Sequence, residues 1–133
     1  MEYIRYFPRQ HWDSRLGRFQ SLAFRPSDDG GISVVEQPCA TAGHSLCEHL
    51  RIFYPSAGEP PIFWRFSDAI LPNTTSIVES PSDTGDTCHR DIINISNKDS
   101  SNIFKKFCAQ PDDIEICVGN ESRRFSPSDM STV

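Results

Sequence analysis

Cysteine and histidine are the residues of this sequence that offer the most chemistry, and several lie close together. Two cysteines and two histidines fall between residues 39 and 49, and a Cys-His pair follows at 88 and 89. Zinc takes four such ligands in a tetrahedron, usually supplied as pairs two to four residues apart. The cysteines here do not have that spacing. The sequence therefore predicts no cofactor, and the alternative is a zinc ion held by Cys39, His44, Cys47 and Cys88.

A cysteine paired with a histidine could also act as a nucleophile. The histidine takes the thiol proton, and its positive charge lowers the pKa of the thiol. Cys47 lies close to both His44 and His49, and Cys88 could meet a distant histidine across the fold. No recognised cysteine-protease pattern surrounds any of the five cysteines. The catalytic candidates of this kind are Cys47 with His49 or His44, and Cys88 with a histidine from elsewhere in the chain.

A third kind of site would use histidine and arginine on a phosphate group. An acid, a base and an anion clamp are what a metal-free nuclease or an ADP-ribosyl transferase requires. His11, Arg18, Ser21 and His89 could supply them, while Trp12 could stack on a base. Arg25 and Arg90 are further candidates for binding the anion, because guanidinium matches phosphate and carboxylate geometry.

The net charge of −5 is unevenly distributed. Residues 1–66 carry seven basic and seven acidic side chains, whereas residues 67–133 carry six and eleven. All seven basic residues of the first half are arginine. Ion pairing is the commoner use of such residues, so we expect them to pair with the acidic second half; a local pocket for a small anion or nucleotide is the alternative. A broad nucleic-acid surface is excluded, because it needs clustered basic charge.

The acidic second half suits a protein that binds a basic partner. Acidic surfaces complement basic ones and speed association. The stretch from Asp83 to Asp91 is the acidic loop of the sequence, and Asp83 and Asp86 are the binding candidates within it. The other interpretation is that these carboxylates only solvate a loop.

The elements that must position these residues are short. Ten Pro and seven Gly in 133 residues predict a loop-rich α+β domain with a mostly antiparallel sheet of about five to seven strands. One or two short helices are expected. The first starts at about Ser45, which forms a capping box with Glu48, and the second runs from Asp99 or Ser100 to about Ala109. Strands are expected at 18–25, 32–36, 50–54, 61–66, 75–79, 91–95 and 114–118, with the first two forming a hairpin. In 61–66 the residues alternate, so that Ile62, Trp64 and Phe66 share one face and Phe63 and Arg65 the other.

The first of these strands carries a resemblance. Arg18-Phe-Gln-Ser-Leu-Ala-Phe-Arg-Pro26, followed by Gly31-Ile-Ser-Val34, resembles the pattern Arg-x-Ser-Ser-x-Ala-Phe-x-Pro, a Gly-bearing turn, then Leu/Ile-Ser-Val. That pattern occurs near the start of small uncharacterised bacterial proteins. Gln20 stands where the pattern has its first Ser. The resemblance covers about residues 4–35; it implies a hairpin and a bacterial source, and it implies no reaction.

The chain is expected to form one domain over residues 1–120, with a frayed polar tail over 121–133. No run of 18 apolar residues is present, so no membrane partner is expected. The odd number of cysteines and an opening without an apolar export signal favour free thiols in the cytoplasm.

Together these features favour a small bacterial accessory or regulatory module that binds a protein partner, in a defence or toxin-type operon. The alternative is a small Cys/His- or Arg/His-dependent enzyme acting on a nucleotide or RNA phosphate.

Overall fold

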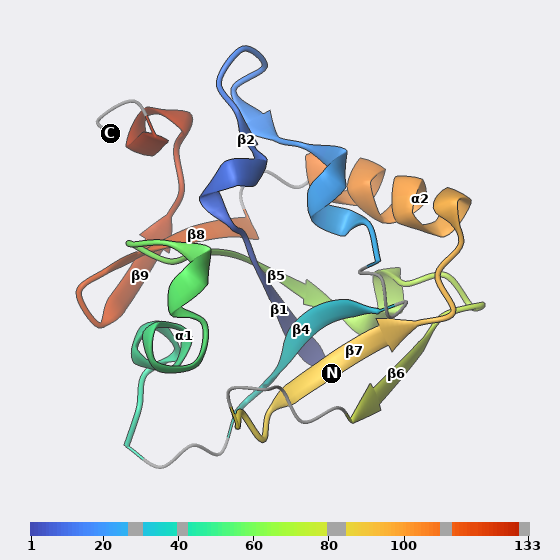
Figure 1. Ribbon diagram of the computed structural model, residues 1–133, viewed down its shortest axis with the longest axis horizontal. Helices are drawn as coiled ribbons and strands as arrows, with labels where there is room; N and C mark the ends of the chain where they lie inside the picture. The colour runs from blue at the N-terminus through green and yellow to red at the C-terminus, as the bar shows by residue number, and fades with distance from the viewer. Residues whose placement is uncertain (27–30, 40–42, 80–84, 110–112, 131–133) are drawn as a thin grey trace.

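A seven-stranded antiparallel sheet forms the centre of the computed structural model, in the order β6-β7-β4-β1-β5-β8-β9 (Figure 1). The structure describes residues 1–26, 31–39, 43–79, 85–109 and 113–130. The strands of this sheet are β1 (Glu2–Tyr6), β4 (Ile32–Gln37), β5 (Ile62–Ser67), β6 (Ser76–Glu79), β7 (His89–Ile93), β8 (Ile114–Val118) and β9 (Glu121–Arg124). The predicted α+β fold, a single small domain, is confirmed.

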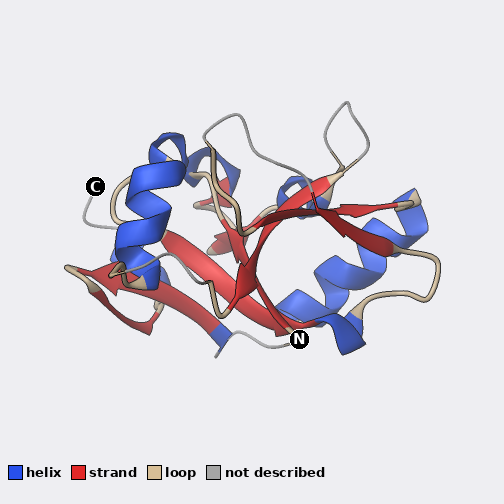
Figure 2. Cartoon of the chain, turned by 90° about the horizontal axis from the view of Figure 1, so that it is seen from below, coloured by secondary structure: helices blue, strands red, loops and turns tan. Residues whose placement is uncertain are grey.

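Two α-helices cover opposite faces of the sheet (Figure 2). They are α1 (Leu46–Phe53) and α2 (Asn97–Cys108). Successive side chains of a strand point to opposite faces. Thus Tyr3 and Trp64 pack on the α2 side of the sheet. Ile4 and Phe63 pack on the α1 side. The predicted alternation of apolar residues in 61–66 is therefore confirmed.

Side-chain caps start both helices. Ser45 accepts a hydrogen bond from the backbone N–H of Glu48, whose carboxylate accepts one from the N–H of Ser45, as the sequence predicted. Ser96 and Asp99 form the same arrangement at α2, so this helix begins a few residues earlier than predicted. Neither helix is long and apolar enough to cross a membrane, among the residues described.

The core on the α2 side is aromatic. Phe24 contacts Phe7, Trp64 and Phe107, with ring centroids 4.9 to 5.8 Å apart. A small hairpin of β2 (Trp12–Asp13) and β3 (Arg18–Phe19), followed by a 3₁₀ helix (Ser21–Phe24), closes this side. These segments hold Phe19 and Phe24 in the core while leaving the polar residues between them exposed.

Two disulfides hold the α1 side. Cys39 is bonded to Cys88, and Cys47 of α1 is bonded to Cys117 of β8. Cys108, at the end of α2, is exposed and is a free thiol. The expectation of free thiols is therefore wrong for four of the five cysteines. The pairs are 49 and 70 residues apart in sequence, so their spacing along the chain gave no sign of the pairing.

Four further predictions of local structure are corrected. Residues 18–25 form β3 and the 3₁₀ helix instead of one strand, and β3 pairs with β2 rather than with β4. Residues 50–53 belong to α1, because the cap at Ser45 propagates an amphipathic helix as far as Phe53, just before Pro55. The tail does not fray at 121, since β9 pairs with β8 and Phe125 is buried. The turn at 27–30 lies outside the described residues.

Counting thiols tests the disulfides. When the protein is denatured without a reductant and alkylated, we expect one labelled cysteine, Cys108, in each chain. Alkylation after reduction should label all five. Peptide mapping by mass spectrometry should show the 39–88 and 47–117 links. The variant Cys108→Ser is the control and should take up no label before reduction. More than one labelled residue in the unreduced wild-type protein would contradict the assignment.

Candidate functional site

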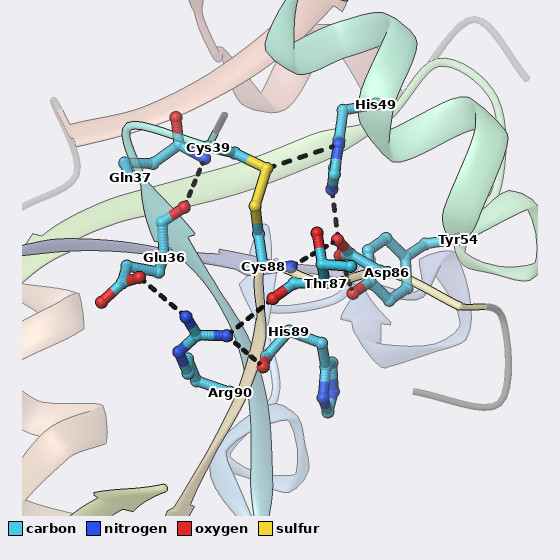
Figure 3. A network of polar contacts seen from close by, with 10 residues as sticks. All are labelled: Glu36, Gln37, Cys39, His49, Tyr54, Asp86, Thr87, Cys88, His89 and Arg90. Atoms are coloured by element: carbon cyan, nitrogen blue, oxygen red, sulfur yellow. Dashed lines mark hydrogen bonds and ion pairs between the residues drawn. A yellow bond between two sulfur atoms is a disulfide. The ribbon is translucent and has the colours of Figure 1, made fainter. Parts of the chain in front are cut away.

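A buried polar network joins α1 to the start of β7 (Figure 3). His49 lies on α1 and Tyr54 directly follows that helix. Asp86 comes three residues before β7. His49 and Asp86 are only 2 % and 1 % exposed, although a histidine and an aspartate are rarely buried without a partner.

The carboxylate of Asp86 is the centre of this network. Its Oδ2 lies 2.9 Å from Nε2 of His49 and also accepts a hydrogen bond from the Tyr54 hydroxyl. Its Oδ1 accepts a hydrogen bond of 2.9 Å from the backbone N–H of Cys88. The other ring nitrogen of His49, Nδ1, lies 3.9 Å from the Cys39 sulfur. The imidazole thus lies between the disulfide and the carboxylate (Figure 3).

These contacts set the charge of Asp86. Burial by itself would raise the pKa of the carboxyl group, since it disfavours the charged form. The hydrogen bonds from Tyr54, His49 and the N–H of Cys88 outweigh burial, and the pKa of Asp86 is lowered below its ordinary value. The aspartate is therefore ionised at neutral pH. It ties together an α-helix, the residue after it and the start of a strand.

The burial of this network limits its chemistry. A catalytic acid or base must reach its substrate. The side chains of His49 and Asp86 are 3 % and 0 % exposed, so no substrate reaches them in this conformation. The network is a structural link, and the chemistry that its groups could perform is the binding of an ion small enough to be enclosed.

The predicted cysteine sites do not form as expected. Cys47 is bonded to Cys117 and so has no thiol to act as a nucleophile beside His49. The predicted zinc ligands are divided between two disulfides, and His44 is partly exposed, 3.6 Å from Glu48. The sulfurs of Cys39 and Cys88 instead lie with an oxygen of Asp86, all within 4.8 Å of one another.

His89 and Arg90, two other candidates, belong to the sheet rather than to a site. His89 is buried, with Nε2 3.9 Å from Asp91. Arg90 bonds Glu36 at 2.9 Å, so its guanidinium links β7 to β4. Asp86 does not form part of an acidic surface, because its carboxylate is buried; Asp83 lies outside the described residues.

A second candidate site lies on the α2 side, next to the β2–β3 hairpin. Arg18, Ser21 and Arg25 line an open pocket of about 420 Å³. Leu16 and Leu22 line the same pocket and are 62 % and 46 % exposed. The rest of its lining consists of Asp13, Phe19, Gln20 and Phe104. This pocket thus brings together three of the predicted catalytic and binding residues, and Arg18 also lines a smaller pocket with Trp12.

The seven arginines of the first half were expected to pair with the acidic second half, and Arg65 does so through Glu115. Arg51 pairs with Glu59 of its own half. The five arginines before residue 26 have no carboxylate partner in the described part of the chain. Arg5 donates to the backbone oxygens of Ala23 and Ser33. Arg9 donates to the backbone oxygen of Pro60. Arg18 lies over the ring of Phe104, 5.7 Å from its centroid. The acidic residues instead pair with basic residues later in the chain, such as Arg51, Arg65, Arg90 and Arg123.

His11 and Trp12 do not complete this pocket. His11 is half-buried beside Arg5, and burial followed by the charge of Arg5 lowers the pKa of its imidazole. Trp12 packs edge-on against Phe19 and Phe125 and lines a neighbouring apolar pocket of about 200 Å³. The second tryptophan, Trp64, is buried in the core. The acid and base expected beside Arg18 are therefore not supplied by histidine.

Known proteins provide no guide to either site. No family model, curated protein or solved structure matches the chain. The resemblance of residues 4–35 to small bacterial proteins therefore stays a prediction.

Sequence reasoning missed several residues of the two sites. Tyr54 was assigned to a strand, and its hydroxyl instead bonds Asp86. Cys117 was not matched with Cys47. Leu16 and Leu22 were not singled out, and a single exposed leucine is an ordinary feature of a protein surface. The spacing Asp86-x-Cys88, in which the carboxylate accepts the N–H two residues on, was the one local signal.

The buried carboxylate predicts a pH-dependent loss of stability. Because its pKa is lowered on folding, Asp86 stabilises the protein above the pKa of the unfolded chain, and this contribution is lost as pH falls through the folded value. We expect Asp86→Asn to lower the free energy of unfolding at pH 7 by about 3 kcal/mol, because it leaves His49 and Tyr54 without their charged acceptor. Urea unfolding monitored by circular dichroism measures it.

The difference between Asp86→Asn and wild type should shrink as pH falls below about 4. Asp113→Asn is the matched control, since Asp113 is exposed and should change stability by less than about 0.5 kcal/mol. Equal stability of Asp86→Asn and wild type at pH 7 would show that the network holds nothing together.

Proposed function

We propose that this protein is an accessory or regulatory module that binds an acidic, partly apolar segment of a partner protein in the pocket of Arg18 and Arg25. The observation that supports this proposal most is that two arginines of one pocket lack a carboxylate partner among the described residues. On a chain with a net charge of −5, Arg18 and Arg25 line one pocket and have no carboxylate partner among the described residues.

The pocket combines charge with apolar surface. Arg18 and Arg25 offer guanidinium groups that pair with carboxylates in two parallel hydrogen bonds. Leu16 and Leu22 offer apolar side chains beside them. Arginine and aromatic residues are enriched at protein interfaces, and Phe104 lines this pocket beneath Arg18. A partner segment in which Asp or Glu stands next to Leu, Ile or Phe complements both features.

The partner proposed here has the opposite charge from the partner that the sequence suggested. The acidic second half suggested a basic partner, with Asp83 and Asp86 as binding residues. Asp86 is enclosed, and other acids of the second half, such as Glu115 and Asp129, are paired with arginines. The unpaired arginines make an acidic partner the better complement.

The phosphate-directed enzyme is the weaker alternative. A nucleotide would also pair with Arg18 and Arg25. A nucleic acid base needs an aromatic face on which to stack. Trp12 is packed on Phe19 and Phe125, and Trp64 is buried. The histidine nearest in sequence, His11, is not among the described residues that line the pocket.

A peptide selection tests the proposal. The oxidised protein is used to select from a displayed library of random peptides. We expect the selected peptides to be enriched in Asp and Glu next to large apolar residues, and binding to weaken as salt rises. The variant Arg25→Glu should weaken the binding of a selected peptide about tenfold or more, measured by isothermal titration calorimetry.

Lys98→Glu is the matched control for charge. It changes the net charge by the same amount at an exposed position outside the pocket, so it should change affinity less than about threefold. Selected peptides without acidic residues, or equal effects of the two variants, would contradict the proposal. Tighter binding of a nucleoside diphosphate than of any peptide, lost in Arg25→Glu, would favour the enzyme instead.

The source and location of the protein stay predictions. They are a bacterial cytoplasm and a defence or toxin-type operon. Disulfides persist in oxidising compartments, and in a reducing cytoplasm the same four cysteines would be thiols.

A further inference from the structure

Four groups able to bind a metal meet between α1 and the strands β4 and β7. The sulfurs of Cys39 and Cys88 and an oxygen of Asp86 lie within 4.8 Å of one another. Nδ1 of His49 lies 3.9 Å from the Cys39 sulfur on the helix side (Figure 3). They come from three separate parts of the chain: the residues after β4, the helix α1 and the residues before β7.

We propose that, once the Cys39–Cys88 disulfide is reduced, these four residues bind a zinc ion. The ligands are the thiolates of Cys39 and Cys88, the carboxylate of Asp86 and the imidazole of His49. The proposed binding function does not enter this inference, because Arg18 and Arg25 lie on the α2 side of the sheet.

The reaction has two steps. In the first, a dithiol or a phosphine supplies two electrons to the disulfide. The sulfur–sulfur bond breaks, each sulfur gains one proton, and the reductant leaves as a disulfide or, with water, as a phosphine oxide. In the second, Zn²⁺ forms bonds to both sulfurs, and the two thiol protons go to solvent. A small-molecule disulfide reverses the change: it takes two electrons from the two thiolates and leaves as two thiols with protons from solvent, the sulfur–sulfur bond of Cys39 and Cys88 forms again, and the ion is released.

The ligand types favour zinc over harder cations. Thiolates and imidazole are ligands of zinc, whereas magnesium and calcium prefer oxygen. A tetrahedral zinc ion has sulfur ligands at about 2.3 Å and nitrogen or oxygen ligands at about 2.0 Å, which separates neighbouring ligand atoms by about 3 to 4 Å. The two sulfurs and an oxygen of Asp86 lie within 4.8 Å of one another, and Nδ1 of His49 lies 3.9 Å from the Cys39 sulfur. Breaking the sulfur–sulfur bond lets the two sulfurs move apart, and His49 must exchange its hydrogen bond to Asp86 for a bond to the ion.

The surroundings of the cluster suit a structural metal. The Tyr54 hydroxyl and the N–H of Cys88 both donate to Asp86 and would orient its carboxylate toward the ion. Asp86 and His49 are buried, which keeps water from a fourth position. His44 and His89 are not ligands, since they face Glu48 and Asp91. The zinc ion would thus replace one link between the ends of β4 and β7 with another.

Cobalt(II) binding to the reduced protein tests the site. The protein is reduced with a water-soluble phosphine, which is then removed under nitrogen, and Co²⁺ is added. We expect one Co²⁺ per chain, with visible bands of tetrahedral cobalt and near-ultraviolet bands from thiolate to cobalt. Zn²⁺ should displace it, and the oxidised protein should bind none.

Variants distinguish this site from the other thiols. A Cys108→Ser background removes the exposed free thiol. In that background Cys88→Ser should abolish the thiolate bands, and His49→Gln should lower cobalt affinity about tenfold or more. The matched control is the pair Cys47→Ser and Cys117→Ser, which removes the other two sulfurs and should keep one Co²⁺ per chain.

Circular dichroism separates loss of binding from loss of folding. If the reduced protein unfolds and zinc restores its spectrum, the proposal is supported, because binding and folding are then coupled. If the reduced protein shows no thiolate-to-cobalt bands after Co²⁺ is added, whether it is folded or unfolded, the proposal is overturned. Equal loss of the bands in Cys88→Ser and in the Cys47/Cys117 control would also overturn it. The peptide selection uses the oxidised protein, so its result is independent.

Discussion

The structure depends on covering both faces of one sheet with few apolar residues. Apolar side chains make up 37 % of the chain, and β1, at the centre of the sheet, sends Tyr3 to one face and Ile4 to the other. On the α2 side, clustered aromatic rings supply the buried area. On the α1 side, a helix of eight residues supplies little, and three buried cysteines make up part of the core. On that side the disulfides and the hydrogen bonds of a buried carboxylate add the stability that apolar packing does not supply.

This shortage explains why a charged group sits in the interior. Asp86 would cost several kcal/mol if it were buried alone, and it is retained because three donors from two parts of the chain converge on it. The network fixes α1 against the start of β7. The same requirement places a carboxylate and an imidazole beside two sulfurs. The two sulfurs form a disulfide when oxidised, and in the proposal all four groups bind a metal when the sulfurs are reduced.

The other side of the sheet has the opposite character. Its core is filled by rings, so the polar residues of the β2–β3 hairpin and the following 3₁₀ helix face solvent. Arg18 and Arg25 remain without a carboxylate there among the described residues, next to two exposed leucines. The sheet therefore separates a closed, cross-linked side from an open side suited to a partner.

The sequence alone determined the features that depend on neighbours along the chain. The capping box at Ser45, the alternation in 61–66 and the α+β class all follow from local patterns, because caps and pleats repeat over a few residues. The pairing of cysteines 49 and 70 residues apart, the partners of Asp86 and the unpaired arginines do not follow from such patterns. The central strand β1 was missed too, because five residues with one arginine and two tyrosines show no clear period. These features were decided by which strands became neighbours, since only the folded sheet sets the distances between remote side chains.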